Sequence, residues 1–368
     1  MDALQDSLVS WLSLIRDNRF SLMQKHSLLD KFGSLDIISQ AAYKDLCDFL
    51  GVRVEVGRDK RFRESLRLNL KRDLDWLRQD GNHLICWGDA NYPKLLTEIS
   101  DPPLCLFASG DLSLLSEPKI SVVGSRRPSP AGIKITKNLS SDLSKLGIVI
   151  TSGMALGIDA VSHQSALDVS GGTIAVMGCG LDIITPLRNR RLFEKINQQG
   201  LMLSEYPVSY PASRYTFPQR NRIVSGLSYG VIIVEAAQKS GTLITARMAM
   251  EQNREVFVVP GSPVNPQYAG SNELIRQGAL LLANVDDVLV ELSVSLQADP
   301  ALSVFDSLAS KGQAVDHPII RYISYESTPI DQIILESGLT ASEVSSMLLI
   351  LEIEGVIAIS DDGGYLLV

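Results

Sequence analysis

The chain has 368 residues, of which 45% are hydrophobic and 21% are charged. That length suits two or three domains, and the composition excludes a largely disordered chain. The formal net charge of −8 would argue against a nucleic-acid partner if it were evenly spread. It is not, because residues 315–368 hold nine acidic residues and one basic residue, while the other 314 residues hold 33 of each. The acidic excess belongs to the C-terminal segment, so the rest of the chain can present a basic face.

No apolar run approaches the roughly 18 residues of a membrane span, and residues 1–19 carry acids where a secretion signal is basic. We therefore expect a cytoplasmic protein without a membrane span. The four cysteines, Cys47, Cys86, Cys105 and Cys179, are widely spaced and include no C-x-x-C pair. This spacing suits neither a zinc site nor a disulfide framework, so we expect buried free thiols.

Residues 1–80 are predicted to form a small helical domain. Apolar residues such as Leu8, Trp11, Leu12 and Ile15 recur three and four residues apart, which is the spacing of one helix face. The predicted helix over residues 58–78 mixes bases with acids, which is typical of a solvated face with ion pairs one turn apart. A nucleic-acid patch on this helix is the alternative.

Residues 81–295 alternate short apolar runs with helical segments, the pattern of an α/β fold with a Rossmann-like, mostly parallel sheet. The predicted strands are residues 120–123, 148–151, 174–177, 201–203, 231–235, 256–259 and 280–282. The helices between them include residues 131–146, 158–167, 192–198 and 243–252. Ligands of such sheets bind beyond the carboxyl ends of the strands, so one composite pocket is expected there.

Residues 296–314, rich in small and polar residues, are predicted to be a linker. Residues 315–368 have the pattern of a winged-helix domain. Its predicted helices are residues 319–325, 330–336 and 341–354, followed by a hairpin of residues 356–359 and 365–368. The helix over residues 341–354 carries three glutamates and no base, whereas a DNA-reading helix lies against phosphates. We therefore expect this acidic domain to bind protein or to pack internally.

Small, hydroxylated and basic residues follow several of the predicted strands. At a helix start they offer backbone and hydroxyl donors to an anion, and glycine lets a phosphate approach the main chain. Arginine and lysine supply the positive charge. The candidate nucleic-acid-binding residues in these turns are Gly124, Ser125, Arg126, Ser152, Gly153, Lys239, Ser240, Gly241 and Thr242.

A further candidate segment, Phe217-Pro218-Gln219-Arg220-Asn221-Arg222, lies between the fourth and fifth predicted strands. Arginines beside an aromatic ring suit the phosphates and the stacked bases of a single strand. We therefore add Phe217, Arg220, Asn221 and Arg222 to the candidate binding residues. The alternative is that Asn221 and Arg222 hold the long preceding loop through internal hydrogen bonds.

Several catalytic motifs are absent from the sequence. It has no G-x-x-x-x-G-K-[ST] P-loop, and no G-x-G-x-x-G follows the first predicted strand, which disfavours P-loop ATPase and dinucleotide redox chemistry. No pair of carboxylates has the spacing of a two-metal nuclease. His163 stands alone on a predicted helix, where packing is the better interpretation, and Glu235 is the one carboxylate placed at a strand end for acid–base chemistry. We expect no cofactor and no metal.

Many blocks between residues 92 and 287 occur in the same order as in a known family. They include Asp101-Pro102-Pro103, Val123-Gly124-Ser125-Arg126, Gly157-Ile158-Asp159, Ser204-Glu205-Tyr206-Pro207, Phe217-Pro218 with Arg220-Asn221-Arg222, Lys239-Ser240-Gly241-Thr242 and Pro260-Gly261. Together they resemble the DNA processing protein A family, also called DprA or Smf. The N-terminal helical module resembles that family's SAM-like domain only loosely, and the acidic tail resembles its winged-helix domain.

The resemblance implies a single-stranded-DNA-binding protein rather than an enzyme. It implies a homodimer formed through the Rossmann-like domain, which protects DNA in natural transformation and recombination and loads the RecA recombinase onto strands coated by single-strand-binding protein. By position, Ser125, Arg126, Arg222, Lys239, Ser240 and Gly241 would form the DNA pocket. The family usually has an arginine where this chain has Leu156, so one phosphate contact would be missing.

An enzyme is the alternative. A similar Rossmann layout occurs in nucleotide phosphoribohydrolases resembling the lysine-decarboxylase-like family, in which a strand-end glutamate and a Gly-Thr turn handle a nucleoside monophosphate. Glu235 with Gly241 and Thr242 permits this hypothesis. Release of free base from nucleoside monophosphates would separate it from DNA binding.

Overall fold

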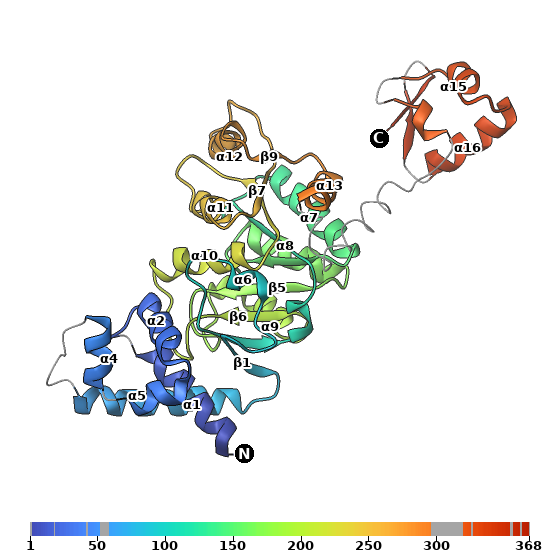
Figure 1. Ribbon diagram of the computed structural model, residues 1–368. Helices are drawn as coiled ribbons and strands as arrows, with labels where there is room; N and C mark the ends of the chain where they lie inside the picture. The colour runs from blue at the N-terminus through green and yellow to red at the C-terminus, as the bar shows by residue number, and fades with distance from the viewer. Residues whose placement is uncertain are drawn as a thin grey trace. The chain divides into compact units, whose positions relative to one another are not determined.

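The computed structural model describes residues 2–17, 19–41, 43–51, 59–295, 319–324, 327–353, 356–360 and 363–367. The chain forms two compact units, Met1–Ser295 and Leu296–Val368 (Figure 1). Each unit has a hydrophobic core of its own. The predicted linker, residues 296–314, lies outside the described residues.

The first unit begins with helices that pack against one edge of the sheet. They are α1 (Asp2–Arg16), α2 (Leu22–Phe32), α3 (Leu35–Gln40), α4 (Tyr43–Leu50) and α5 (Asp59–Leu77). Leu14 and Leu28 from these helices share a core with Cys105 of the sheet, so helices and sheet form one compact unit. The helical region expected over residues 1–80 is therefore present, and its boundary as a separate domain stays a prediction.

The sheet of the first unit is mostly parallel. Its strands are β1 (Asn82–Cys86), β2 (Cys105–Gly110), β3 (Lys119–Gly124), β4 (Val149–Ser152), β5 (Thr173–Met177), β6 (Leu201–Ser204), β7 (Gly230–Glu235), β8 (Glu255–Val258) and β9 (Leu280–Leu281). They lie in the order β1-β2-β6-β5-β4-β3-β7-β8-β9, and only the β1–β2 and β2–β6 pairings are antiparallel. Strands β4, β5 and β6 lie in order on one side of β3, and strands β7, β8 and β9 lie in order on its other side. This reversal of strand order is where open α/β sheets bind ligands.

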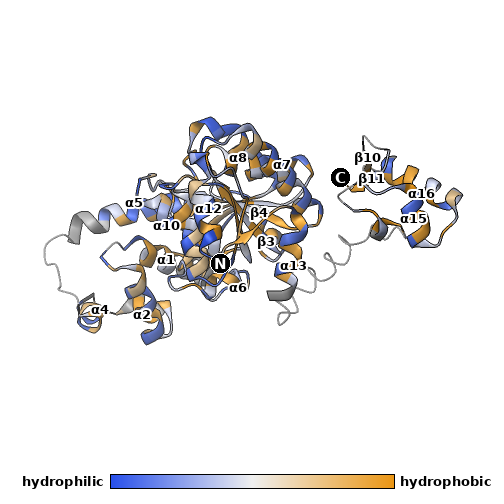
Figure 2. Cartoon of the chain, turned by 90° about the horizontal axis from the view of Figure 1, so that it is seen from above, coloured by the Kyte–Doolittle hydropathy of each residue, from blue (hydrophilic) through white to orange (hydrophobic). Residues whose placement is uncertain are grey.

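Helices cover both faces of this sheet, as Figure 2 shows by the apolar strands between amphipathic helices. The elements between the strands are α6 (Lys94–Thr97), η1 (Leu112–Leu115), α7 (Pro130–Lys145), α8 (Ile158–Asp168), η2 (Leu187–Asn189), α9 (Arg190–Gln199), α10 (Thr216–Gly226), α11 (Thr242–Glu251), η3 (Pro266–Tyr268) and α12 (Ala269–Arg276), and α13 (Val285–Ser295) follows the last strand. Alternate strand residues point to opposite faces. In β5, Val176 belongs to the core on the face covered by α10, whereas Ala175 and Met177 belong to the core on the face covered by α9.

The α/β prediction is confirmed, and the seven predicted strands correspond to β3–β9. The two antiparallel strands β1 and β2 were not predicted. They span only 5 and 6 residues, and a short apolar run can belong equally to a strand or to a buried helix segment. The described cysteines are buried and unpaired, as expected.

The second unit is a small winged helix with α15 (Ile330–Ser337), α16 (Ala341–Ile353) and a hairpin of β10 (Ile357–Ile359) and β11 (Tyr365–Leu367). The helix predicted over residues 319–325 is only the short turn η5 (Ile320–Tyr322). It ends because Ile323 is extended, and Thr328 then pairs with Tyr365 of the hairpin. Among the described residues no single helix is long and apolar enough to cross a membrane, although Ile330–Ser337 and Ala341–Glu352, bent by 115°, would meet that test together.

Candidate nucleic-acid interface

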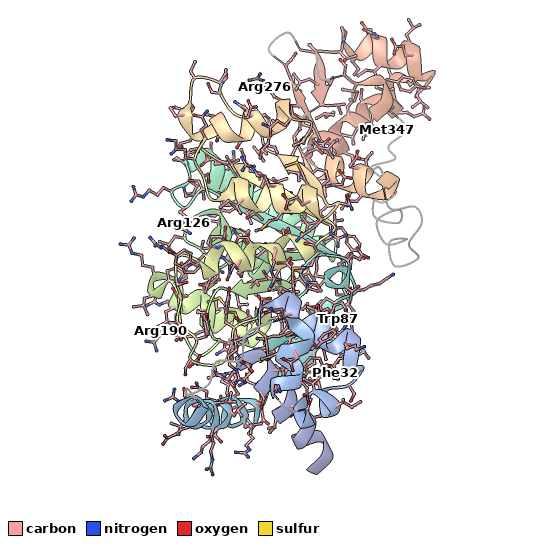
Figure 3. The ribbon with its side chains drawn as sticks, turned by 60° about the vertical axis from the view of Figure 1, so that its left-hand side comes forward. Phe32, Trp87, Arg126, Arg190, Arg276 and Met347 are labelled. Carbon is pink, nitrogen blue, oxygen red and sulfur yellow. The ribbon has the colours of Figure 1, made fainter. Side chains whose placement is uncertain are left out.

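A cleft of about 750 Å³ opens at the carboxyl ends of β3, β4 and β7, where the strand order reverses. It is bounded by α10 and by the start of α11. Eleven of the thirteen predicted residues line it: Gly124, Ser125, Arg126, Gly153, Phe217, Arg220, Asn221, Lys239, Ser240, Gly241 and Thr242. Ser152, Arg222 and Leu156 do not line it. Figure 3 shows Arg126 at the surface of this unit.

The turn after β3 is held close to its neighbours. The strand register shifts between Val123 and Gly124. A Cβ atom on Gly124 would lie 2.7 Å from Ile158 Cγ1, so only glycine fits without a shift. The Ile158 N–H donates to the Ser125 carbonyl at 3.1 Å, and the Thr242 hydroxyl donates to the Gly124 carbonyl at 3.1 Å. These bonds fix the main chain beneath Arg126.

The turn after β4 uses its donors internally, contrary to the prediction that they face an anion. The N–H groups of Gly153 and Ala155 each donate to the buried Asp159 carboxylate at 3.2 Å. Burial raises the pKa of Asp159, and the nearby Arg220 opposes that shift. The Ser152 hydroxyl is buried and donates to the Val122 carbonyl at 2.6 Å. Ser152 is therefore a structural residue in this structure.

Arg220 lines the cleft as a buried residue of its floor. The side chain is only 5% exposed, and its guanidinium donates to the carbonyls of Gly153, at 2.6 Å, and Val176. It also donates to the Asn221 side-chain oxygen at 3.2 Å. These hydrogen bonds occupy the Arg220 guanidinium group, which the sequence led us to expect at a phosphate. Arg220 joins β5 to the turn after β4.

Arg222 faces the opposite side of α10. It donates to both Glu205 carboxylate oxygens, at 2.5 and 2.6 Å, and its Nε lies 3.0 Å from Asp101. The structure therefore places Arg222 outside the cleft, which agrees with the alternative that it holds the preceding loop. Asn221, one residue earlier, lines the cleft. Successive residues on a helix point about 100° apart, which separates these neighbours.

The exposed basic side chains that line the cleft come from three loops. Arg126 follows β3, Lys239 follows β7, and Arg214 precedes α10; all three are exposed and line the cleft. The Arg214 guanidinium lies 4.7 Å from the centre of the exposed Tyr215 ring. Arg214 was not among the binding residues predicted from the sequence. The sequence signal that could have identified it is a basic residue followed by an aromatic residue, three and two positions before Phe217.

Glu235 cannot serve acid–base chemistry in the cleft. It is fully buried, and its carboxylate accepts hydrogen bonds from the Ser129 N–H at 2.9 Å, the Ser129 hydroxyl and the Tyr268 hydroxyl at 2.7 Å. Ser129 also caps α7 by accepting from the Gly132 N–H at 3.0 Å. Glu235 therefore anchors the first turn of α7 to β7. The residue on which the enzymatic alternative depends has its oxygens already occupied.

His163 is also buried, between α8 and the sheet. Its Nδ1 lies 2.7 Å from the Thr173 hydroxyl, which itself donates to the Ile150 carbonyl. The histidine must then be the donor, so the neutral Nδ1–H tautomer is present. Burial, assisted by the charge of Arg220, lowers the pKa of His163 to about 3. Packing is thus its role here. Within the described ranges no group of three or more metal-ligating side chains comes together.

Comparison with known families agrees with this geometry. A family model described as DNA recombination-mediator protein A matches residues 83–293, more than half of the chain. The chain belongs to this family. A second model, the DprA winged helix domain, matches residues 306–363. The resemblance inferred from the sequence blocks is therefore confirmed.

Named members of the recombination-mediator family resemble most of the chain. Protein Smf of Escherichia coli (strain K12) is 41% identical over 310 residues, which cover 83% of this chain and 83% of that protein. The DNA processing protein DprA of Bacillus subtilis (strain 168) is 42% identical over 62% of this chain and 77% of its own.

Two solved structures of the family share the fold. The X-ray structure of DNA processing protein A from Streptococcus pneumoniae superposes with a TM-score of 0.68 at 36% identity, covering 76% of this chain and 95% of that one. The structure of DNA processing protein A from Helicobacter pylori, described as having a unique single-stranded DNA binding mode, gives 0.53 at 35% identity and covers 58% of this chain and 97% of that one.

Proposed function

We propose that this chain binds single-stranded DNA in the cleft and does not act as an enzyme. The observation that carries the proposal is the placement of exposed Arg126, Arg214 and Lys239 around a hollow that contains Phe217. Cations suit the phosphates of any sequence, and an aromatic ring stacks on any unpaired base. The single-stranded DNA binding mode described for the related Helicobacter pylori protein supports the same ligand.

Photo-crosslinking tests where the strand lies. An oligothymidine carrying 5-iodouracil is irradiated with the full-length protein, and the adducts are located by mass spectrometry. The proposal expects adducts on Phe217 or Tyr215. Adducts confined to residues 319–367, or to the far edge of the sheet around β9, would place the strand elsewhere.

We further propose the finer role that the resemblance implied. The chain would act in the cytoplasm as a homodimer, protect single strands in natural transformation and recombination, and load RecA onto strands coated by single-strand-binding protein. Relatives named as recombination mediators and DNA processing proteins support this role. The test is the rate of RecA filament formation on coated strands with and without the protein, alongside sedimentation to measure its mass. No acceleration of RecA would contradict the loading role.

The absence of enzymatic activity is a separate part of the proposal. Glu235 was the acid–base candidate for a nucleotide phosphoribohydrolase, and its carboxylate is buried and hydrogen-bonded by Ser129 and Tyr268. Incubation with nucleoside monophosphates should therefore release no free base above a protein-free control. Turnover that disappears in a Glu235→Gln variant would revive the enzymatic hypothesis.

A further inference from the structure

A cluster of exposed basic residues lies at the start of α9, outside the cleft. Arg188 belongs to the short turn η2, and Arg191 and Lys195 belong to α9. All three side chains are exposed, whereas the inner face of α9 is buried. We name this cluster the α9 patch and define it by these three residues. Arg191 and Lys195 are one helical turn apart, so their Cβ atoms lie about 5–6 Å from each other on the outer face of α9.

The neighbouring acids are engaged elsewhere and do not neutralise the α9 patch. Glu194 is paired with Arg190, whose Nε lies 2.9 Å from the carboxylate. The Asp182 carboxylate, in the preceding loop, accepts from the Ser209 N–H at 2.7 Å and from the Ser209 hydroxyl at 2.9 Å. Within the part of the chain that the structure describes, the patch side chains form no hydrogen bond or ion pair. Their N–H donors are therefore available to an anion.

The α9 patch adjoins the rim of the cleft through Asn189. This residue is buried, and its side-chain amide donates to the carbonyl oxygens of Met154 and Ala155 at 3.0 and 3.2 Å. Ala155, in the turn after β4, lines the cleft. Arg188 immediately precedes Asn189, so the patch begins where this turn ends the cleft.

The basic loops follow one another along the carboxyl edge of the sheet. In the strand order β5-β4-β3-β7, Lys239 follows β7 and Arg126 follows β3. The turn after β4 passes through Leu156 and carries no cation, and a Cβ atom on its Gly157 would lie 2.9 Å from Arg126 Cα. The patch comes next, after β5. Neighbouring strands are about 4.8 Å apart, so β3 and β5 are about 10 Å apart. Figure 3 shows Arg126 and Arg190, beside the patch, on the same side of this unit.

We propose that the α9 patch is a second contact for the phosphates of the single strand that occupies the cleft. A strand that leaves the cleft past Arg126 crosses the uncharged turn after β4 and then meets Arg188 and Arg191. Guanidinium groups bind phosphates whatever the base, so this contact depends on the length of the strand and not on its sequence. The inference rests on the proposed DNA binding and adds to it a subsite that only strands longer than the cleft reach.

The test compares two labelled oligothymidines, one short enough to fill the cleft alone and one several times longer, by fluorescence anisotropy with the full-length protein. The double variant Arg188→Gln/Arg191→Gln should weaken the longer strand about ten-fold or more at about 0.1 M salt. It should also reduce the slope of log K against log salt for that strand by about 1.4, because each phosphate contact contributes about 0.7. The short strand should bind within two-fold of the wild type, which also shows that the variant is folded.

The matched control is the double variant Arg67→Gln/Lys71→Gln. Both residues are exposed, and their side chains form no ion pair among the described residues. They lie on α5, which packs against the edge strand β1, away from the cleft. The control removes the same total charge as the patch variant and should change the binding of neither strand.

Modified strands locate the contact on the DNA. The longer oligothymidine is made with uncharged methylphosphonate linkages at its 5′ end or at its 3′ end. One of these two strands should bind the wild-type protein as weakly as the unmodified strand binds Arg188→Gln/Arg191→Gln. The patch variant should bind that strand and the unmodified strand alike, because the phosphates that were neutralised no longer have a partner.

The outcomes separate this inference from the function on which it rests. If Lys239→Ala weakens both strands but Arg188→Gln/Arg191→Gln binds the longer strand no more weakly than Arg67→Gln/Lys71→Gln does, the patch assignment is wrong and DNA binding in the cleft stands. If the wild-type protein binds neither strand at low salt, both fail.

Discussion

Arg220 is a buried cation whose guanidinium holds the carbonyl oxygens of Gly153 and Val176 beneath the cleft. An Arg220→Met variant would leave both acceptors buried without this donor and would remove a positive charge that acts on the buried Asp159 carboxylate. We expect the free energy of unfolding to fall by roughly 3 kcal/mol. Urea denaturation of the full-length protein measures it. Arg190→Met, at an exposed arginine paired with Glu194, should change stability by no more than about 0.5 kcal/mol. Equal effects would contradict the structural role.

Arg126 and Lys239 should behave in the opposite way, because both are exposed at the cleft. Arg126→Ala and Lys239→Ala should leave stability unchanged and weaken binding to all single strands alike. Each should reduce the slope of log K against log salt by about 0.7, the contribution of one phosphate contact on a single strand. The matched control is Arg276→Ala, an exposed arginine that does not line the cleft. A variant with the wild-type slope would remove that residue from the interface.

His163 predicts a pH dependence of stability. Its pKa is about 3 in the folded chain, because of burial and then Arg220, and about 6.5 in the unfolded chain. Between these values the unfolded chain binds the proton and the folded chain does not. The His163 contribution is therefore complete above about pH 6.5 and is lost as the pH falls towards 3, by up to about 1.4 kcal/mol per pH unit.

The check on this pH dependence is a comparison of slopes. Denaturation midpoints are measured from about pH 7 to about pH 4.5 for the wild-type chain and for His163→Gln, which cannot titrate. The variant should lose less stability over that interval, whatever its stability at neutral pH. Parallel curves would show that the His163 pKa is close to 6.5 in the folded chain as well.

Among the structural elements, the first turn of α8 supports the cleft through Gly157. This glycine has φ of 84°, and a Cβ atom there would lie 2.3 Å from the Ser125 carbonyl oxygen. Gly157→Ala should therefore displace the turn that carries Arg126, lowering stability by about 1–3 kcal/mol and weakening DNA binding. Gly147→Ala is the matched control, because Gly147 also has positive φ but nothing lies within 4 Å of its Cβ position. If both variants bound DNA like the wild type, the turn would not position Arg126.

The strands and helix α10 show why some features could be predicted from the sequence and others could not. The runs that became β3, β4, β5, β7 and β8 are apolar and are followed by turns that contain glycine, so periodicity and turn chemistry agree. Whether a basic side chain in α10 reaches the cleft depends on its angle around the helix and on what lies opposite. Arg220 meets buried carbonyls and Arg222 meets Glu205, and these partners come from distant strands. Residue type and spacing therefore predicted most residues of the cleft but could not separate its exposed arginines from the buried, hydrogen-bonded ones.

For the whole molecule, the charges divide by segment. Residues 315–368 carry the entire formal charge of −8, and the cleft belongs to the other compact unit, which has exposed cations at its rim. A formal net charge taken over the full chain therefore conceals an interface suited to an anion. Affinity for DNA is set by the local groups that meet phosphates, and it depends strongly on salt.

The measurement that tests the central claim most directly is fluorescence anisotropy of a labelled oligothymidine and a duplex of the same length, titrated with the full-length protein at several salt concentrations. Binding in the cleft predicts tight, salt-sensitive association with the single strand and much weaker association with the duplex, because a duplex offers no unstacked base to Phe217. Equal affinity for both ligands, or no binding to either at low salt, would contradict it.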